Sequence, residues 1–224
     1  MEGIKWLLNR GRYLQSCFLA DAPGIGKTVQ VLSALVVLCK KLAFSNILVI
    51  TPTSSLVTWI YELKRFPELD ASTLVLVGET KDCKKTLRHH LEQPVGSVDR
   101  PKLILTSFDT FDLCSNLLLT IRWDAMIVDE AHLLSNPTTG LHKLAAQVSA
   151  MWRVFISATP HQNSFGEFLS LLNLLDPAVF SHDVIQQLEP SSFTDIGRGN
   201  YEALVKPFFL SRTKKELPTP LHYS

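Results

Sequence analysis

The chain has 224 residues, of which 46% are hydrophobic and 19% charged, and its formal net charge is +1. This size and balance fit one compact α/β domain with a well-buried core. A net charge so close to zero argues against a domain that binds nucleic acid with its whole surface, so any DNA contact must be local.

The sequence also disfavours membrane proteins and zinc proteins. No apolar run approaches the roughly 20 residues that a membrane helix needs, and the N-terminus lacks the shape of a signal peptide. The cysteines are scattered, with no C-x-x-C pair, which favours reduced thiols of the cytosol or nucleus over a zinc site. They are Cys17, Cys39, Cys83 and Cys114.

The chain opens with a helix, a strand and a second helix. Residues 3–8 are typical of the end of an amphipathic helix, and residues 17–20 are an apolar run of strand length. The helical pattern of apolar residues resumes over residues 28–41. The stretch between this strand and the second helix then has to be a tight turn.

That turn has the pattern of a phosphate-binding loop, D-A-P-G-I-G-K-T over residues 21–28. Gly24 and Gly26 allow backbone N–H groups to point inward around an anion, and the positive end of the following helix adds to that field. Lys27 would reach the outer phosphates of a nucleotide, and the Thr28 hydroxyl would hold Mg²⁺.

The loop departs from the pattern G-x-x-x-x-G-K-[ST] at its first position, where Asp21 replaces glycine. Taken alone, the stretch could be a chance turn and helix cap. Together with the acidic motif described below, it predicts a nucleotide site. The predicted nucleotide contacts in the loop are Asp21, Pro23, Gly24, Ile25, Gly26, Lys27, Thr28 and Val29.

Strands and helices alternate through the rest of the chain. The predicted strands are continuous apolar runs at residues 46–51, 73–77, 102–106, 124–129 and 152–157. The predicted helices cover residues 55–66, 80–91, 113–121, 139–149 and 164–175. This alternation predicts an α/β fold with a mostly parallel central sheet and helices on both faces.

The predicted helix at residues 80–91 has one very basic face. A charge run is more often a solvated surface than a binding site, although a DNA contact here stays an alternative. The basic residues are Lys81, Lys84, Lys85, Arg88 and His89.

The end of the chain differs in composition. Residues 189–200 have the pattern of a flexible loop, and residues 201–210 that of a partial helix followed by an apolar anchor. Charged residues and prolines then follow. We therefore expect a domain over residues 1–210 and the start of a linker over residues 211–224.

The polar motifs all follow the carboxyl ends of predicted strands, where ligands bind in parallel α/β sheets. Asp129 and Glu130 come directly after a buried strand, which directs both carboxylates toward the phosphate loop. Asp129 can hold Mg²⁺ and Glu130 can orient and deprotonate the attacking water, so Lys27, Asp129 and Glu130 are the candidate catalytic residues. The alternative for the acidic pair is a surface helix cap.

Small polar residues follow the last central strand. Ser157, Thr159 and Gln162 could bond the carboxylates of the acidic pair, or they could simply cap the turn. The residues themselves leave both interpretations open.

Six motifs in this order resemble the first motor lobe of the Swi/Snf-type chromatin-remodelling ATPases, within the DEAD/DEAH helicase superfamily. They are D-A-P-G-I-G-K-T-V-Q, I-T-P-T-S-S-L-V-T-W, L-T-S-F-D-T-F, V-D-E-A-H, S-A-T-P-H-Q-N-S and P-F-F-L-S-R-T-K-K-E-L. The resemblance runs from residue 3 to about residue 217.

The resemblance implies a RecA-like P-loop NTPase lobe that binds ATP and Mg²⁺ and moves along duplex DNA in the nucleus, sliding nucleosomes or displacing bound proteins. It implies Thr28 and Asp129 as metal contacts and Gln162 as a residue that couples ATP to DNA. It also implies contacts to DNA phosphates, which would be independent of sequence and sensitive to salt. The candidate DNA contacts are Thr51, Pro52, Thr53, Ser107, Phe108 and Asn163.

Two departures from the family pattern bear on function. Ala22 and Pro23 replace the usual Glu and Met, and Pro23 lacks an N–H that could contact phosphate. The second motor lobe, which supplies arginines to the transition state, is absent, so this chain alone is expected to turn over little ATP. A truncated, non-catalytic module that binds DNA or a partner is the alternative function, and an RNA helicase lobe is a third.

Overall fold

The computed structural model describes residues 2–78, 80–92, 101–158, 165–188 and 204–213. Several predictions concern residues outside these ranges. They are the turn residue Thr159, the coupling residues Gln162 and Asn163, the loop at 189–200 and most of the predicted linker.

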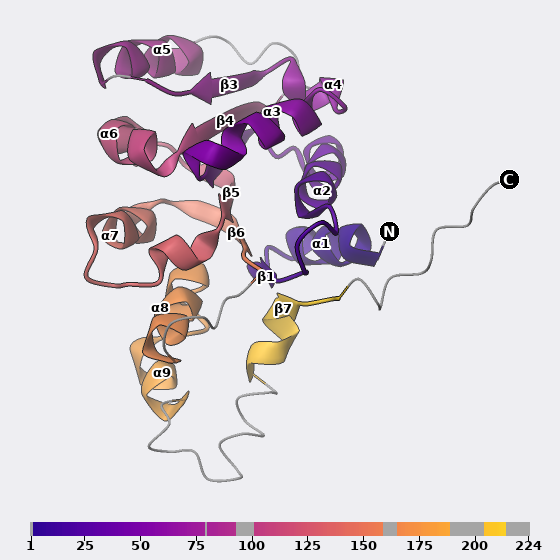
Figure 1. Cartoon of the computed structure of the whole chain (residues 1–224), viewed down its shortest axis with the longest axis vertical. Helices are drawn as coiled ribbons and strands as arrows, with labels where there is room; N and C mark the ends of the chain where they lie inside the picture. Colours follow the sequence, from indigo (N-terminus) through magenta and orange to yellow (C-terminus); the bar gives the residue numbers. More distant parts are fainter. Residues whose placement is uncertain (1, 79, 93–100, 159–164, 189–203, 214–224) are drawn as a thin grey trace, which may run out of the picture.

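Seven strands of the described residues form one sheet in the order β3-β4-β2-β5-β6-β1-β7 (Figure 1). Every neighbouring pair in this sheet is parallel, which confirms the predicted fold class. The strands are β1 (Cys17–Leu19), β2 (Asn46–Thr51), β3 (Thr73–Leu76), β4 (Lys102–Ser107), β5 (Trp123–Asp129), β6 (Ala150–Ile156) and β7 (Phe209–Leu210).

Helices cover both faces of the sheet (Figure 1). One face carries α1 (Glu2–Arg12), α2 (Lys27–Leu42), α3 (Leu56–Leu63) and α4 (Pro67–Asp70). The other face carries α5 (Thr80–Glu92), α6 (Phe108–Leu118), α7 (Gly140–Gln147), α8 (Phe165–Leu175) and α9 (His182–Leu188). The part of the chain that the structure describes also contains the 3₁₀ turns η1 (Thr53–Ser55), η2 (Ala131–Leu134) and η4 (Lys206–Phe208).

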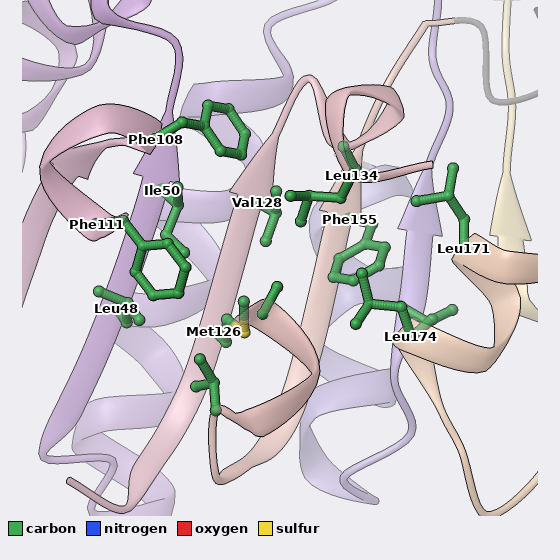
Figure 2. Close-up of a cluster of buried hydrophobic side chains, with 14 of the residues drawn as sticks. Leu48, Ile50, Phe108, Phe111, Met126, Val128, Leu134, Phe155, Leu171 and Leu174 are labelled. Carbon is green, nitrogen blue, oxygen red and sulfur yellow. The ribbon is translucent and has the colours of Figure 1, made fainter. Parts of the chain in front are cut away.

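The central strands are apolar on both sides because each side packs against helices. In β2, Leu48 and Ile50 join the hydrophobic cluster under α6 and α8, whereas Ile47 and Val49 join the cluster under α2 and α3. Figure 2 shows the first of these clusters, with Leu48 and Ile50 beside side chains from β5, β6 and the covering helices. This burial explains why the strands are continuous apolar runs rather than alternating ones.

Most predicted elements match the structure, and the differences have local causes. The strand predicted at residues 46–51 is β2 with the same bounds. The capped turn predicted from Ser107 and the helix predicted at 113–121 are one helix, Phe108–Leu118, in which the Ser107 hydroxyl accepts a hydrogen bond from the Thr110 N–H. The short elements α4, α9 and β7 were not predicted. Two residues are too few for a strand pattern, as β7 illustrates.

Strand β7 brings the end of the described chain beside β1. Phe209 pairs with Phe18, and their rings stack with centroids 4.7 Å apart. Beyond β7, the Ser211 hydroxyl donates a hydrogen bond to the carbonyl of Ala20 at 3.3 Å. These contacts pack residues 209–211 against the domain predicted over residues 1–210.

All four cysteines are free thiols. Burial raises the pKa of Cys17, and burial together with the negative charge of Asp124 raises the pKa of Cys39 to about 12. None of the helices described here is long and apolar enough to cross a membrane.

Candidate nucleotide-binding site

The loop between β1 and α2 has the backbone conformation that its glycines predict. Gly24 and Gly26 have φ angles of 82° and 79°, in the left-handed region that glycine adopts without strain. Gly26 is the N-cap of α2, and a Cβ built on it would meet no atom within 4 Å. The space beside Gly26 is therefore open, and the N–H groups of a helix N-terminus lie next to it.

The side chain of Lys27, the first residue of α2, reaches back to the start of this loop. Its Nζ donates hydrogen bonds to the backbone carbonyls of Asp21 at 2.8 Å and Ala22 at 3.5 Å. Thr28 and Val29 are half-buried in the first turn of α2, Ile25 is half-buried, and Pro23 and Gly24 are exposed. The loop thus brings the predicted phosphate contacts together around one turn of backbone.

The Asp21 side chain is held inside the protein. It is fully buried, and its carboxylate accepts hydrogen bonds from both Nε and Nη2 of Arg212, the Nε contact at 3.0 Å. Gln30 Nε2 donates a further hydrogen bond to it at 3.3 Å. The hydrogen bond to Asp21 raises the pKa of Arg212. The Asp21 carboxylate oxygens are therefore taken up inside the protein, so a nucleotide contact predicted for this residue would have to use its main chain.

Asp129, the last residue of β5, is held by three donors. Its Oδ2 accepts hydrogen bonds from the Thr51 hydroxyl at 3.1 Å and the Trp59 indole N–H at 2.9 Å. Its Oδ1 accepts one from the Glu130 backbone N–H at 3.0 Å. Thr51 ends β2 and Trp59 lies on α3, so two neighbouring elements fix the orientation of this carboxylate.

Glu130 follows in a strained conformation. It has a φ of 50° and a ψ of 48°, a left-handed geometry that costs a non-glycine residue about 1–3 kcal/mol and is concentrated at functional sites. Its side chain is 43% exposed, and one of its carboxylate oxygens lies 3.3 Å from His132 Nδ1. The same nitrogen lies 3.3 Å from the Ser157 hydroxyl. Ser157 thus approaches Glu130 through His132.

The register of the sheet places the loop and the acidic pair at the same level. Leu19 and Asp129 are both paired with Ile156, one on each side of β6. Since neighbouring strands lie about 4.8 Å apart, the ends of β1 and β5 are about 10 Å apart. The loop that follows Leu19 and the carboxylates of Asp129 and Glu130 therefore share the carboxyl edge of the sheet.

The predicted DNA contacts divide into two groups. Thr51 is 0% exposed, Ser107 3% and Phe108 7%. Thr51 holds Asp129, Ser107 caps α6, and Phe108 packs in the core. The side chains of these three residues therefore offer little surface to DNA, so a DNA contact predicted for them would have to use their main chain. Pro52 is half-buried and Thr53 is exposed, so these two remain available.

Sequence reasoning missed several residues of the site. Trp59 was expected to face the core, which it does, but its N–H also reaches Asp129. His132 stands inside the V-D-E-A-H motif without having been given a role. Gln30 and Arg212 both lie in motifs that carry the family resemblance, but neither was given a role, and their contact could not be predicted because Arg212 and Asp21 are separated by 191 positions.

The family model of the SNF2-related domain matches residues 1–222. The chain belongs to the SNF2-related domain family. Among curated relatives, the chromodomain-helicase-DNA-binding protein 1-like of Mus musculus is 31% identical over 99% of this chain and 24% of its own length. The chromatin remodeling factor mit1 of Schizosaccharomyces pombe is 28% identical over 97% of this chain and 15% of its own length. The SNF2-related chain thus spans about a quarter or less of these relatives.

A solved structure supports the fold of this SNF2-related domain. The Sulfolobus solfataricus SWI2/SNF2 ATPase core in complex with dsDNA superposes with a TM-score of 0.78 at 24% identity. The match covers 95% of this chain and 43% of that one. The RecA-like fold predicted from the motifs is therefore confirmed.

Proposed function

We propose that this chain is the ATP-binding lobe of a DNA-dependent ATPase of the Swi/Snf type. Residues 1–210 form the lobe, and the segment from residue 211 to 224 begins the connection to a second lobe. The observation that carries the proposal is the pairing of both Leu19 and Asp129 with Ile156, which aligns the phosphate loop with the acidic pair. Membership of the SNF2-related family supports it independently.

Each residue of the site has one role in this proposal. Gly24, Gly26 and the N-terminus of α2 cradle the phosphates with backbone N–H groups, and Lys27 exchanges its carbonyl contacts for the outer phosphates. Glu130 orients the attacking water and accepts its proton. The half-exposed carboxylate of Glu130 and its nearby imidazole are consistent with that task.

The donors present fit a magnesium ion bound together with substrate. Mg²⁺ is usually held by one or two carboxylates, a hydroxyl and substrate phosphates. Thr28 and Asp129 supply the hydroxyl and the carboxylate, and the three donors around Asp129 fix the direction of that carboxylate. When bound, the ion would neutralise charge that develops on the phosphates.

The DNA part of the proposal rests on the family and on the exposed turn after β2. One relative is named as a helicase-DNA-binding protein, another as a chromatin remodeling factor, and one similar structure contains duplex DNA. We extend these properties to this chain as movement along duplex DNA, with nucleosomes as a possible substrate and the nucleus as its location. Thr53 and Pro52 are the exposed or half-exposed candidates for phosphate contacts, and Asn163 stays a prediction.

The isolated lobe is expected to bind ATP weakly and to hydrolyse little of it. A second lobe would supply arginines to the transition state, and arginine fingers raise rates by about 10³–10⁵-fold. Gln162 would couple ATP to DNA once both lobes are present.

The test measures ATP binding and hydrolysis by the 224-residue chain with duplex DNA, with RNA and without nucleic acid. The proposal predicts binding that requires Lys27, very slow hydrolysis, and faster hydrolysis on duplex DNA than on RNA once a second lobe is attached. Rapid turnover by the lobe alone would refute the dependence on a second lobe. Absence of ATP binding would favour the alternative, a non-catalytic module for DNA or a partner.

A further inference from the structure

A buried ion pair joins the start of the phosphate loop to the end of the described chain. Asp21 is 0% exposed and Arg212 is 9% exposed, and the guanidinium contacts both carboxylate oxygens. A bidentate pair of this kind fixes orientation as well as distance. Arg212 lies two residues after β7, where the chain leaves the sheet toward the predicted linker.

Gln30 extends this contact to the other side of the loop. Its Oε1 accepts a hydrogen bond from Arg212 Nη2 at 2.7 Å. Its Nε2 donates to the Asp21 carboxylate at 3.3 Å and to the backbone carbonyl of Ile25 at 3.2 Å. One glutamine on α2 therefore connects Arg212 to both the beginning and the middle of the loop.

The backbone makes the same connection a second time. The Ala22 N–H donates to the Arg212 carbonyl at 2.9 Å. On the opposite side of the loop, Lys27 donates to the carbonyl of Asp21. Asp21 is thus contacted by Arg212 through its side chain and by the phosphate-binding lysine through its backbone.

Helix α1 closes this network tightly. A Cβ built on Gly3 would lie 1.7 Å from Gln30 Oε1 and 2.5 Å from Arg212 Nη2. Glycine at this position allows α1 to approach the two side chains. Glu2 lies 3.6 Å from Arg212 Nη1, but its side chain is 76% exposed and adds little.

We infer that Arg212 is a positioning residue for the phosphate loop and that it ties nucleotide affinity to the docking of the outgoing segment at residues 209–213. The inference rests on the proposed function, since it assumes that the loop binds nucleotide. When Arg212 is withdrawn, the buried Asp21 carboxylate loses its partner and the loop leaves its binding conformation. Movement of a second lobe that pulls on this segment would then loosen nucleotide binding.

The size of the expected change in nucleotide affinity follows from the fraction of molecules whose phosphate loop is correctly formed. Apparent affinity falls in proportion to that fraction, so a loop formed one tenth of the time binds about tenfold more weakly. Lysine carries the same charge as arginine but cannot make the bidentate contact. Arg212→Lys therefore removes the positioning while it retains a cation for Asp21.

The experiment titrates a fluorescent ATP analogue with Mg²⁺ into the 224-residue chain and its variants, with thermal unfolding measured in parallel. Arg212→Lys is expected to raise the dissociation constant by about tenfold or more at a temperature where the protein remains folded. Gly3→Ala, which displaces Gln30 and Arg212 from the side of α1, is expected to act in the same direction and replaces the first variant if that one does not fold.

Arg153→Lys is the matched control. Arg153 is also a buried arginine, 8% exposed, but it donates to the carbonyls of Val148 and Leu174 rather than to the loop. The Arg153→Lys substitution should lower the unfolding temperature without changing the dissociation constant of the folded protein for the ATP analogue. An unchanged dissociation constant in folded Arg212→Lys, or in Gly3→Ala as its replacement, would overturn the positioning role alone. A wild-type chain that binds no analogue would overturn the proposed function and this inference with it.

Discussion

The indole nitrogen of Trp59 lies 2.9 Å from Oδ2 of Asp129 and donates a hydrogen bond to it. Trp59 is 1% exposed, and its ring packs in the cluster between α3 and the sheet. The packing of this ring therefore fixes the direction of the carboxylate that is proposed to hold magnesium. A residue that sequence patterns place in the core thus also orients the site.

Trp59→Phe should weaken the effect of magnesium on ATP binding. The substitution retains an aromatic ring but removes the donor to Asp129, and loss of a supporting hydrogen bond to a metal ligand costs about 10–100-fold in metal affinity. ATP-analogue titrations with and without Mg²⁺ measure this directly. Trp123→Phe is the control, because Trp123 is equally buried but donates to the Leu118 carbonyl away from the site. An equal effect of Mg²⁺ on ATP-analogue binding in the two variants would contradict the role of Trp59.

Thr51→Val should act on the same carboxylate from β2. The substitution is close to isosteric and removes the hydroxyl that donates to Asp129 at 3.1 Å, so stability should fall by about 1 kcal/mol and the magnesium effect should decrease. Thr106→Val on β4 removes a buried hydroxyl that donates to the Leu76 carbonyl instead. Urea unfolding and Mg²⁺-dependent binding should show similar stability losses for the two variants but a magnesium effect only for Thr51. If Thr51→Val also reduced DNA binding while leaving magnesium untouched, the original DNA prediction would be restored.

Strand β7 should be an integral part of the lobe. Removal of residues after 206 deletes the Phe209 stack on Phe18, the β7 pairing with β1, and the ion pair of Arg212. Loss of a packed aromatic side chain and of one partner of a buried ion pair should together lower the free energy of unfolding by about 3 kcal/mol or more. A chain that ends at residue 213 should unfold at the same temperature as the full chain. Equal stability of the two truncated chains would show that β7 is dispensable.

The thiol of Cys39 should make stability fall at alkaline pH. Its pKa is raised to about 12 in the folded protein, against about 8.5 for an unfolded thiol. Below the unfolded pKa both states keep the proton. Above it only the unfolded state releases the proton, so unfolding becomes more favourable by about 1.4 kcal/mol per pH unit until the folded pKa is reached. Urea unfolding at about pH 7.5 and about pH 9.5 should show a larger loss in wild type than in Cys39→Ala. A loss of the same size in both would contradict the buried-thiol explanation.

The elements of the fold were predictable where a local pattern is long enough to be decisive. The runs 46–51 and 124–129 are buried on both faces, so their apolar character is continuous and their ends are marked by polar residues. The glycines and lysine of the loop carry their geometry in their own sequence. Strand β7 has only two residues and owes its place to the Phe18 stack, which no local pattern encodes.

The site was predicted less completely because burial decides which polar residue can meet a ligand. Thr51 and Ser107 have the residue types of phosphate contacts, yet both donate or accept hydrogen bonds inside the protein. The partner of Asp21 is 191 positions away in the chain, so a pattern around the loop cannot reveal it. The register of β1, β6 and β5 had to be known before the loop and the acidic pair could be placed at the same level of the sheet.

The most direct test of the account asks whether the loop and Asp129 act on one nucleotide. The dissociation constant of an ATP analogue is measured with Mg²⁺ and with EDTA for wild type, Lys27→Ala and Asp129→Asn. We predict that Mg²⁺ lowers the dissociation constant of wild type. Asp129→Asn should reduce this Mg²⁺-dependent gain in affinity by about tenfold or more while it retains metal-free binding. Lys27→Ala should weaken binding under both conditions. A magnesium gain that persists unchanged in Asp129→Asn would contradict a shared site between the ends of β1 and β5.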